Sequence, residues 1–384
     1  MHIAIDAHSV GAGLAGNESY IANLIEALAA IDTANRYTLY VTRREAVERF
    51  SDRWPHVTVR LTLPHTPLVR IPLTLSAELR RRPVDLLHVQ YTAPPLAPCA
   101  VVATIHDLSF EHLPETFNRR SRAQLRLTVR RTARLAHQVI APSEYSRRDL
   151  LETYHLPRER VQVTPLAAAP CFMPVPDEEQ RRRTKEHYGI KGEYILAVGS
   201  IQPRKNLVTL IESYRDLRAA RPQAKLPQLV LVGKRGWLYG ETFDAVNRHS
   251  IDGDIRFTGY VRETDLPALY TDALCFVYPS YFEGFGLPVL EAMACGAPVV
   301  AGNRTSLPEV LGDAGLLFDP FDTSALTAML ARVIDDGKLR RSLRTRGLER
   351  ASLFNWRETA RRTLEVYERA VAIEAKLGRK RRRA

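Results

Sequence analysis

Two carboxylates eight positions apart, Glu283 and Glu291, flank the segment Gly-Phe-Gly-Leu-Pro-Val-Leu. Residues 284–287 can present backbone amides, and Pro288 suits the first turn of a helix. Carboxylates accept hydrogen bonds from sugar or ribose hydroxyls, and a helix start that is rich in amides holds phosphate. The segment therefore predicts a site for one extended ligand that carries both hydroxyl and phosphate groups.

A second group of residues suited to phosphate lies in residues 199–206. Arg204 and Lys205 are adjacent cations in a loop that begins with Gly199 and Ser200, follows an apolar run and precedes a helical pattern. A guanidinium fork, an ammonium group and the amides of a helix start together favour a diphosphate. We expect a diphosphate site here; the alternative is an ordinary charged surface.

His106 and Asp107 follow directly after another apolar run, residues 101–105. A histidine at the end of a buried strand can bind a polar ligand or move a proton. A lone His-Asp pair is also common in purely structural roles, so the pair by itself leaves both interpretations open.

Gly11, Gly13 and Gly16 form a GxGxxG pattern between an expected strand and an expected helix. Glycines with this spacing let the backbone approach a bound anion, as in dinucleotide-binding sites. Such sites also need an acidic residue after the second strand, where this chain has Thr-Arg-Arg at residues 42–44. Arginines suit a phosphorylated ribose, so a dehydrogenase that uses a dinucleotide phosphate is one alternative, and a merely flexible loop is another.

These motifs are separated by short apolar runs that alternate with helical patterns. A helix is expected over residues 18–31, where Ile21, Leu24, Ile25 and Leu28 recur at spacings of three and four. The apolar runs are continuous, which is typical of buried parallel strands. The expected strands are 2–6, 37–41, 57–61, 84–89, 101–105 and 138–141 in the first half and 194–198, 228–232, 255–258, 274–277, 298–301 and 316–318 in the second.

Repeated strand–helix units predict an α/β fold with a right-handed, doubly wound parallel sheet in each half. A stretch with four prolines between residues 164 and 176 precedes a highly charged segment and indicates the domain boundary. Ligands of such sheets bind beyond the carboxyl ends of the strands, where the motifs lie. We expect a first domain over 1–170, a linker over 171–188, a second domain over 189–354, and a final helix with a basic tail over 355–384.

The net charge of +12 is concentrated in two places. Residues 119–134 carry seven arginines and no acid, and residues 372–384 carry six basic residues and one glutamate. If 119–134 is a helix, arginines at every fourth position form one stripe. This stripe and the apolar segment 68–79 predict peripheral binding to an anionic membrane; a nucleic-acid surface and a solvated face are the alternatives.

The remaining composition, with 45% apolar and 26% charged residues, is ordinary for a globular protein. No apolar run reaches the roughly 18 to 20 residues that cross a bilayer, and Asp6 interrupts the apolar stretch that a signal peptide would continue. The four cysteines are far apart and predict neither disulfides nor a metal site. We expect a cytoplasmic protein, or one bound peripherally to the inner face of the plasma membrane.

The segment that begins at Glu283 and ends at Glu291 resembles the E-x7-E signature of the retaining family 4 glycosyltransferases. The chain is also similar to that family in its glycine-rich first loop, in His-Asp-Leu at 106–108, in residues 199–206 and in Gly-Ala-Pro-Val-Val from Gly296. The resemblance covers the whole chain. It implies the GT-B architecture: two Rossmann-like domains that face each other across a cleft, with the last helix crossing back onto the N-terminal domain. In this family the C-terminal domain binds a nucleotide-sugar and the N-terminal domain binds the acceptor.

The resemblance implies a role for each matching residue. Glu283 would bind hydroxyls of the donor sugar and Glu291 its ribose, while His106 would contact the sugar near the reaction centre. Arg204 and Lys205 would neutralise the departing diphosphate. The other matches form a donor-binding group, Gly16, Gly199, Ser200, Lys234, Tyr260, Val261, Phe285, Gly286 and Leu287, and an acceptor-side group, Gly11, Gly13 and Asp107.

The resemblance further implies substitution with retention, in which the departing phosphate takes the proton of the acceptor. No metal and no other cofactor is expected, and we interpret Asp-Gly-Asp at 252–254 as a turn. The chain departs from the family at two places. Ser200 stands where an arginine is frequent, which leaves more of the phosphate charge to Arg204, and residues 166–169 replace the usual Asn-Gly-Val-Asp.

The function that follows is a hexosyltransferase that moves a sugar to a glycan or lipid-linked acceptor in bacterial cell-surface polysaccharide synthesis. Mannose from GDP-mannose is the first choice, and UDP-glucose, UDP-N-acetylglucosamine and dTDP-rhamnose are alternatives. A nucleotide-sugar epimerase or a phosphorylase-like enzyme would share the fold. A non-enzymatic nucleic-acid-binding protein would use the arginine surface, although no nucleic acid is expected as a partner.

Overall fold

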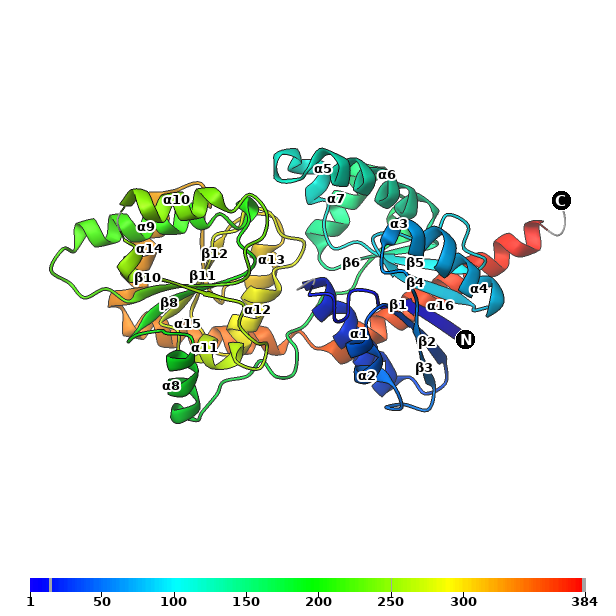
Figure 1. Ribbon diagram of the computed structural model, residues 1–384, viewed down its shortest axis with the longest axis horizontal. Helices are drawn as coiled ribbons and strands as arrows, with labels where there is room; N and C mark the ends of the chain where they lie inside the picture. The colour runs from blue at the N-terminus through cyan, green and yellow to red at the C-terminus, as the bar shows by residue number, and fades with distance from the viewer. Residues whose placement is uncertain (14–15, 250, 382–384) are drawn as a thin grey trace. The chain divides into compact units, whose positions relative to one another are not determined.

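The computed structural model describes residues 1–13, 16–249 and 251–381, and the chain folds into two compact units (Figure 1). Unit 1 is Met1–Leu166 with Asn355–Ala384, and unit 2 is Ala167–Phe354. The segment 171–188, expected to be a linker, belongs to unit 2, because α8 (Glu178–His187) packs on α11 (Leu266–Asp272). The last helix, α16 (Trp356–Arg381), belongs to unit 1 although it follows unit 2 in the sequence.

Unit 1 is built on a seven-stranded sheet in the order β3-β2-β1-β4-β5-β6-β7, and every neighbouring pair is parallel. Six of these strands confirm the sequence prediction. The seventh, β7, was not predicted, because three residues with one polar side chain give too short a pattern. The strands are β1 (His2–Asp6), β2 (Arg36–Val41), β3 (Val57–Leu61), β4 (Leu86–Gln90), β5 (Ala100–Thr104), β6 (Gln138–Ala141) and β7 (Val161–Val163).

Helices cover both faces of this sheet, since its strands are apolar on both sides (Figure 1). One face packs against α1 (Gly16–Ile31), α2 (Arg44–Phe50) and α16; the other packs against α4 (Ser76–Arg81), α6 (Arg119–Leu135) and α7 (Glu144–Tyr154). Short turns of helix complete the unit: α3 (Pro67–Val69), η1 (Arg70–Leu75), α5 (Ser109–His112), η2 (Pro114–Thr116) and η3 (Arg158–Arg160).

Within the described ranges, no helix of either unit is long and apolar enough to cross a membrane.

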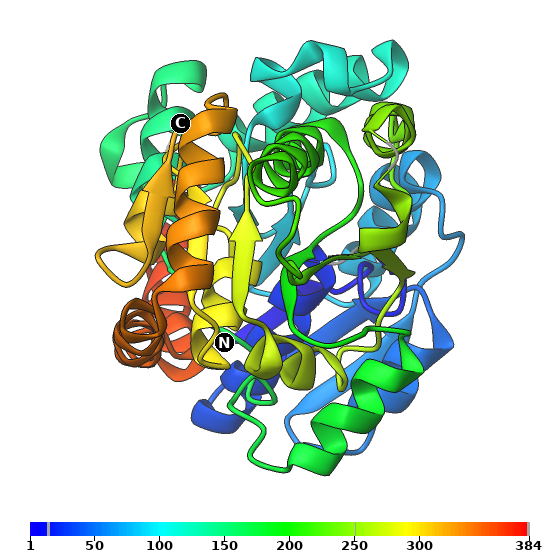
Figure 2. The ribbon, with the colours of Figure 1, turned by 90° about the vertical axis from the view of Figure 1, so that its left-hand side faces the viewer.

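Unit 2 repeats the design with six parallel strands in the order β10-β9-β8-β11-β12-β13 (Figure 2). The strands are β8 (Tyr194–Val198), β9 (Gln228–Val232), β10 (Ile255–Gly259), β11 (Cys275–Tyr278), β12 (Val299–Gly302) and β13 (Leu316–Phe318). Helices α9, α10 and α14 lie on one face, and α8, α11, α12 and α15 on the other (Figure 1). The helices not yet located are α9 (Leu207–Ala220), α10 (Gly240–His249), α12 (Leu287–Ala294), α13 (Leu307–Leu311), α14 (Thr323–Asp335) and α15 (Gly337–Ser352). Two short 3-10 turns, η4 (Pro203–Lys205) and η5 (Asp252–Asp254), complete the unit.

Each sheet has one switch point, where neighbouring strands are followed by loops that leave in opposite directions. It lies between β1 and β4 in unit 1 and between β8 and β11 in unit 2. The diverging loops leave room beyond the carboxyl ends of these strands, and this is where ligands bind in doubly wound sheets. The fold class predicted from the sequence, two doubly wound α/β units, is thereby confirmed.

The segment 68–79 differs from the expected exposed apolar contact. Leu75 and Leu79 are fully buried in the core of unit 1, whereas Leu68, Val69 and Leu73 are exposed and fit the expectation. The reason is Arg70, which is buried and donates to both carboxylate oxygens of Asp6 at 2.8 and 3.0 Å. This paired charge holds η1 against the end of β1 and turns the following apolar side chains inward.

A buried chain of hydrogen bonds ties α16 to the sheet of unit 1. The Tyr367 hydroxyl lies 2.7 Å from Nδ1 of His88, whose Nε2 lies 2.8 Å from the Thr104 hydroxyl. His88 and Tyr367 have no exposed surface. Burial, with a smaller contribution from His106, lowers the pKa of His88 to about 3, so the ring is neutral, and each of its buried nitrogens needs a hydrogen-bond partner.

Replacing Tyr367 by phenylalanine tests this link. We expect Tyr367→Phe to lower the free energy of unfolding by about 1–3 kcal/mol, because Nδ1 of His88 would be buried without a hydrogen-bond partner. Urea unfolding measures the change. The matched control is Tyr260→Phe at a side chain that is 62% exposed, where we expect almost no effect. Equal stability of the two variants would contradict the assigned role of Tyr367.

Candidate active site

The candidate donor site lies at the switch point of unit 2, where the loops after β8 and β11 meet. Arg204 and Lys205 lie in η4, a single turn of 3-10 helix in the loop after β8. Glu283 lies in the loop between β11 and α12. The backbone N–H of Tyr281 donates to the carbonyl oxygen of Arg204 at 3.2 Å, so the two loops are joined directly.

Four side chains hold the carboxylate of Glu283, a residue that is only 6% exposed. Oε2 accepts a hydrogen bond from Nη1 of Arg204 at 2.9 Å. Oε1 accepts from the Ser280 hydroxyl at 2.7 Å, from the Tyr278 hydroxyl at 3.0 Å and from the ammonium group of Lys205. A buried charge is tolerated only when it is paired and hydrogen-bonded, so these contacts fix where the carboxylate lies.

The same contacts keep Glu283 ionised. Burial alone would raise the pKa of Glu283, but the charges of Arg204 and Lys205 and the hydrogen bonds to the carboxylate lower it to about 2. Burial raises the pKa of the Tyr278 hydroxyl well above its usual value, so this group remains a donor. The cluster presents a fixed carboxylate beside two cations, and it can therefore bind sugar hydroxyls and phosphate in one place.

A glycine shapes the loop that leads from Glu283 into α12. Gly286 caps the helix with a φ of 99°, and a Cβ on it would lie 2.6 Å from a methyl carbon of Leu307. Glycine is therefore required for both conformation and space. Phe285 and Leu287 on either side are buried. Because the first turn of a helix leaves N–H groups without helical acceptors, the start of α12 supplies backbone donors close to Glu283.

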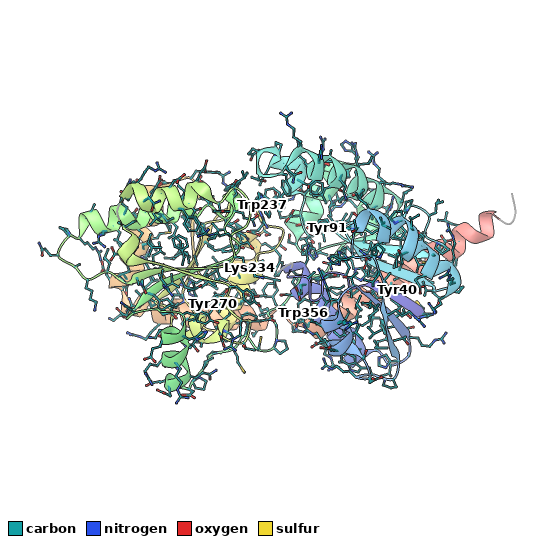
Figure 3. All side chains as sticks on the ribbon, viewed as in Figure 1. Tyr40, Tyr91, Lys234, Trp237, Tyr270 and Trp356 are labelled. Atoms are coloured by element: carbon teal, nitrogen blue, oxygen red, sulfur yellow. The ribbon has the colours of Figure 1, made fainter. Side chains whose placement is uncertain are left out.

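Glu291 lies inside α12 and does not join the Glu283 cluster. Its Oε2 accepts a hydrogen bond from the Tyr270 hydroxyl at 3.3 Å, and Tyr270 is labelled in Figure 3. Burial, and then the charge of Glu263, raise the pKa of Glu291 to about 8. The carboxyl group is therefore mostly protonated at pH 7, and a ligand that donates hydrogen bonds to it would favour its ionised form.

Lys234 and Tyr260 meet at the ends of β9 and β10, the next strands of the sheet. Nζ of Lys234, which is labelled in Figure 3, lies 4.5 Å from the centroid of the Tyr260 ring, a cation–π contact. Tyr260 is 62% exposed, whereas the neighbouring Val261 is buried. This pair thus offers an exposed ring and a cation at the same edge of the sheet as Glu283.

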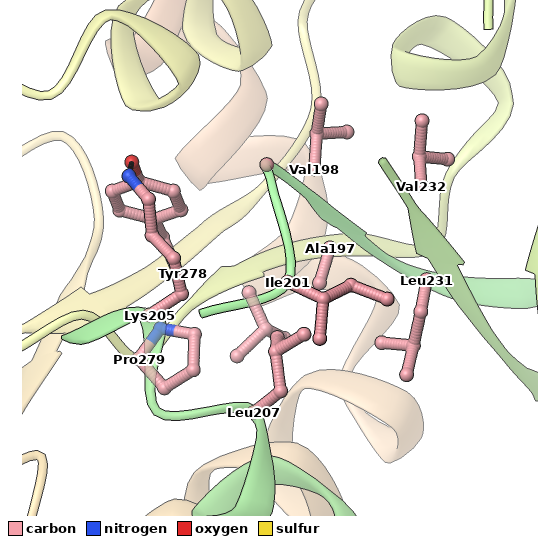
Figure 4. A pocket seen from close by; sticks show the side chains of 11 residues that line it. Ala197, Val198, Ile201, Lys205, Leu207, Leu231, Val232, Tyr278 and Pro279 are labelled. Atoms are coloured by element: carbon pink, nitrogen blue, oxygen red, sulfur yellow. Dashed lines mark hydrogen bonds between the residues drawn. The ribbon is translucent and has the colours of Figure 1, made fainter. Parts of the chain in front are cut away.

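Gly199 and Ser200 begin the loop after β8 and run beside the loop after β9. A Cβ on Gly233 would lie 2.0 Å from the carbonyl oxygen of Gly199, so the two loops approach this closely only because residue 233 is a glycine. The ends of β8, β9 and β11 line a small pocket in which the side chains of Lys205 and Tyr278 lie together (Figure 4). The loops after β8 and β9 and the end of β11 thus lie along one edge of the sheet of unit 2.

In unit 1, His106 follows β5 and is 9% exposed. Its Nε2 lies 3.0 Å from Oε1 of Gln90, the last residue of β4. Burial lowers the pKa of His106 to about 4, so the ring is neutral at pH 7. Asp107 has a local contact instead: its Oδ1 accepts from the backbone N–H and the hydroxyl of Ser109 at 2.9 and 2.7 Å, at the start of α5.

The glycine-rich first loop binds a carboxylate of the chain itself. Glu18, in the first turn of α1, accepts hydrogen bonds from the N–H of Gly11 at 2.8 Å and the N–H of Gly13 at 2.9 Å. Gly16 is the first residue of α1, and a Cβ on it would meet nothing within 4 Å. In this structure the two loop amides already hold an anionic group.

The structure thus brings Arg204, Lys205 and Glu283 together and sets the predicted donor residues in the loops of unit 2 along the same sheet edge. It does not bring Gly16, which begins α1 of unit 1, or Glu291, which lies inside α12, into this cluster. The sequence did not reveal the partners Tyr278, Ser280 and Tyr270. For Tyr278 and Ser280, the sequence offered only their place next to a predicted strand, because Tyr278 ends β11 and Ser280 follows it within the loop. Which side chain reaches Glu283 depends on the folded loop and not on any local pattern.

The Asp-Gly-Asp run at 252–254 forms η5, one turn of 3-10 helix, and Asp254 pairs with Arg218 on α9. Across the part of the chain that the structure describes, no three His, Cys, Asp or Glu side chains are grouped so that they could hold a metal ion.

Comparisons with known proteins cover both halves of the chain. The family model for "Glycosyl transferases group 1" matches residues 179–350, and that for "Glycosyltransferase Family 4" matches residues 15–168. O-antigen chain mannosyltransferase B of Escherichia coli is 36% identical over 267 residues, which are 70% of this chain and 70% of that protein. Serotype-specific mannosyltransferase WbdA of Escherichia coli is 30% identical over 236 residues, 61% of this chain and 29% of that longer protein.

A solved structure shows the same fold. Anabaena HepE, crystallised in complex with UDP-glucose, superposes with a TM-score of 0.74 and 18% identity, over 96% of this chain and 99% of that one. Two parallel-sheet units of this kind are the GT-B fold. With both family models matched, and with 36% identity across 70% of a curated relative, the chain belongs to the family 4 glycosyltransferases.

Proposed function

We propose that this glycosyltransferase is a retaining mannosyltransferase, which moves mannose from GDP-mannose to a glycan or lipid-linked acceptor without a metal ion. The reaction would serve the synthesis of a bacterial cell-surface polysaccharide at the cytoplasmic face of the membrane. The observation that carries the proposal is the carboxylate of Glu283, ionised and fixed between Arg204 and Lys205 beside the start of α12.

Each part of the donor has a matching group in unit 2. Glu283 would accept hydrogen bonds from sugar hydroxyls, and the backbone of Phe285, Gly286 and Leu287 would donate to sugar and phosphate. Glu291 would accept from the ribose hydroxyls. The nucleobase would lie at the exposed ring of Tyr260 with Lys234 and Val261, beyond the loop of Gly199 and Ser200.

Transfer would follow from this placement. The bond between the anomeric carbon and the diphosphate oxygen breaks, and Arg204 and Lys205 stabilise the charge that develops on the diphosphate. The acceptor hydroxyl attacks the same face, a bond forms between its oxygen and the anomeric carbon, and its proton passes to the departing diphosphate oxygen. In this proposal, the two cations supply the positive charge that a metal ion would otherwise provide in this step.

The choice of mannose rests on relatives. Two relatives at 36% and 30% identity are named mannosyltransferases, one of them for an O-antigen chain. The nucleotide part rests on the two loops around Glu283 and on the fold, because HepE holds UDP-glucose in its own structure. The choice of guanine is tested by comparing the binding of GDP-mannose with that of uridine and thymidine nucleotide sugars.

Helix α6 suggests where the enzyme works. The arginine-rich helices α8 and α16 pair their arginines with glutamates, as in Arg182–Glu179 at 2.7 Å and Arg361–Glu358 at 2.7 Å. Helix α6 has no acid. Among the residues that the structure covers, only Arg126 of the seven arginines on α6 forms an ion pair, with Glu111, while Arg122 and Arg131 donate to backbone carbonyls. The other four arginines have neither kind of contact, and three exposed leucines lie on α6 or on the neighbouring loop: Arg119, Arg120, Arg130 and Arg134, with Leu96, Leu127 and Leu135.

Unpaired cations interleaved with exposed leucines suit an anionic lipid surface, where the arginines meet headgroups and the leucines enter the boundary with the acyl chains. We therefore propose peripheral binding of unit 1 through α6. A lipid-linked acceptor would be reached at the same surface.

The donor is tested with a panel of GDP-mannose, UDP-glucose, UDP-N-acetylglucosamine and dTDP-rhamnose. We expect only GDP-mannose to raise the melting temperature, with about 2.7 kcal/mol of added stability at 100 times its Kd. Slow release of mannose should accompany binding and persist in EDTA. A response to another nucleotide sugar would refute the choice of donor, and a requirement for magnesium would refute metal independence.

The role of Glu283 is tested in the same assay. We expect Glu283→Gln to abolish transfer and mannose release while the protein stays folded by circular dichroism. The matched control is Asp335→Asn, which removes an exposed carboxylate paired with Arg221 in the same unit and should retain activity. An active Glu283→Gln variant would remove the basis of the proposal, and sugar interconversion without any acceptor would indicate an epimerase.

The proposed contact of Glu291 with ribose predicts a pH dependence. Ribose hydroxyls donate hydrogen bonds, so binding favours the ionised carboxylate, whereas the pKa of the unliganded group is about 8. The affinity for GDP-mannose should fall as the pH is lowered through 8, by up to about tenfold per unit. Calorimetry between pH 6 and 8.5 measures it. Glu291→Gln should bind more weakly with little pH dependence, and a flat wild-type profile would contradict the ribose contact.

Membrane binding is tested by sedimentation with vesicles that contain phosphatidylglycerol. We expect binding at low salt that weakens at high salt and is absent with phosphatidylcholine alone. Arg130→Gln with Arg134→Gln should weaken it by about 1 kcal/mol per arginine. Arg182→Gln with Arg183→Gln on α8 is the matched control. Failure to sediment, or salt-dependent binding to duplex RNA or DNA in its place, would overturn the membrane proposal.

A further inference from the structure

Four polar groups form one buried row at the switch point of unit 1. Nε2 of His106 lies 3.0 Å from Oε1 of Gln90, and Nε2 of Gln90 donates to the Ser9 hydroxyl at 3.0 Å. The Ser9 hydroxyl in turn donates to the backbone carbonyl of Asn17 at 3.3 Å. Ser9 follows β1, Gln90 ends β4 and His106 follows β5, so the row crosses three neighbouring strands. Ser9, Gln90 and His106 are 1%, 4% and 9% exposed.

The direction of every bond in the row is fixed from one end. The carbonyl oxygen of Asn17 can only accept, so the single proton of the Ser9 hydroxyl points to it. Ser9 must then accept from the amide nitrogen of Gln90, and this orientation turns the amide oxygen of Gln90 toward His106. An amide oxygen can only accept, so Nε2 of His106 carries the hydrogen.

The remaining nitrogen of His106 then has a defined role. Burial lowers the pKa of His106 to about 4, so the ring holds one proton at pH 7, and that proton is on Nε2. Nδ1 therefore has a free lone pair, and it has no hydrogen-bond partner within the described residues. Tyr20 packs edge-on against the ring at 4.7 Å and Tyr91 lies at 5.7 Å, so the orientation of the ring is held as well.

The row begins at the same helix start that holds the glycine-rich loop. Asn17 is followed by Glu18, whose carboxylate accepts from the amides of Gly11 and Gly13. Ser9 lies just before this loop. The carbonyl oxygen of Asn17, in the first turn of α1, therefore determines which nitrogen of His106 carries the hydrogen.

We propose that Ser9 and Gln90 are positioning residues: they hold His106 as the Nε2–H tautomer, so that Nδ1 accepts a hydrogen bond from a hydroxyl group of a substrate. The substrate part of this inference rests on the proposed sugar transfer. His106 orients the hydroxyl and does not take its proton, because a group with such weak basicity is a poor base at neutral pH.

The tautomer is tested in the ligand-free full-length protein labelled with ¹⁵N-histidine. The signals of His106 are assigned by their loss in His106→Asn. We expect a protonated Nε2 and an unprotonated Nδ1 in the wild type, with no titration between pH 5.5 and 8. Ser9→Ala frees the Gln90 amide to turn over and should populate the second tautomer. A wild-type ring protonated on Nδ1, or an unchanged spectrum in both Ser9→Ala and Gln90→Leu, overturns the inference.

Activity provides the second measurement. Gln90→Leu should lower kcat/KM for mannose transfer by about tenfold or more, because the hydroxyl is no longer held in one geometry. In Gln90→Glu, the carboxylate still accepts a hydrogen bond from Nε2–H, so at high pH this variant should be more active than Gln90→Leu. The carboxylate also stabilises the imidazolium form of His106. Activity should therefore fall on the acidic side of the pH profile, where the wild type shows no such fall.

The matched control is Gln138→Leu, at a buried glutamine on β6 whose amide oxygen has no hydrogen-bond partner among the described residues. It should change neither the His106 spectrum nor the pH profile. If Gln138→Leu lowers kcat/KM as much as Gln90→Leu does, the effect is general loss of packing and the positioning role is wrong. If no nucleotide sugar supports transfer in the wild type, the proposed function fails, whereas the tautomer is decided by the spectrum of the ligand-free protein alone.

Discussion

The buried carboxylate of Glu283 and its two cations form the interaction on which the arrangement of the candidate site in unit 2 depends. Arg204 and Lys205 are 79 and 78 positions away in the sequence, and only the adjacency of β8 and β11 brings them to Glu283. Removing either cation would leave the buried carboxylate with one ion pair in place of two. Ion pairing therefore sets the two loops in place before any ligand binds, and a preorganised charge needs no rearrangement when phosphate charge develops beside it.

The two units use their switch points in different ways. At β8 and β11 the side chains are charged, with a carboxylate between a guanidinium and an ammonium group. At β1, β4 and β5 the row of Ser9, Gln90 and His106 is neutral and linked by hydrogen bonds alone, and the charge of Asp6 at the end of β1 is paired with Arg70. A charged edge suits a phosphorylated ligand, and a neutral row with one free lone pair suits a hydroxyl group. The same sheet topology thus presents two kinds of chemistry.

The sequence predicted the strands and the motif residues because both leave local patterns. Continuous apolar runs gave twelve strands, and the spacing of Glu283 and Glu291 marked the loop and helix of the candidate site. The contacts of these residues were not predictable in the same way. Ser280 and Gln90 are ordinary polar residues whose importance comes from strand adjacency, and Arg70 turned a predicted exposed segment inward by pairing with Asp6. Pairings across a sheet are decided by topology, which no local pattern contains.

Glu283 and Glu291 show how far environment outweighs residue type. Both are glutamates on one loop–helix segment, yet the pKa of Glu283 is lowered to about 2 and that of Glu291 is raised to about 8. Glu283 has two cations; Glu291 has a tyrosine hydroxyl at 3.3 Å and the like charge of Glu263 nearby. Burying a neutral carboxyl costs less free energy than burying an unpaired carboxylate, so Glu291 needs no cation while it is protonated. Hydroxyl donors supplied by a ligand would favour the ionised form of Glu291. The same side chain can thus be neutral without a ligand and ionised with one.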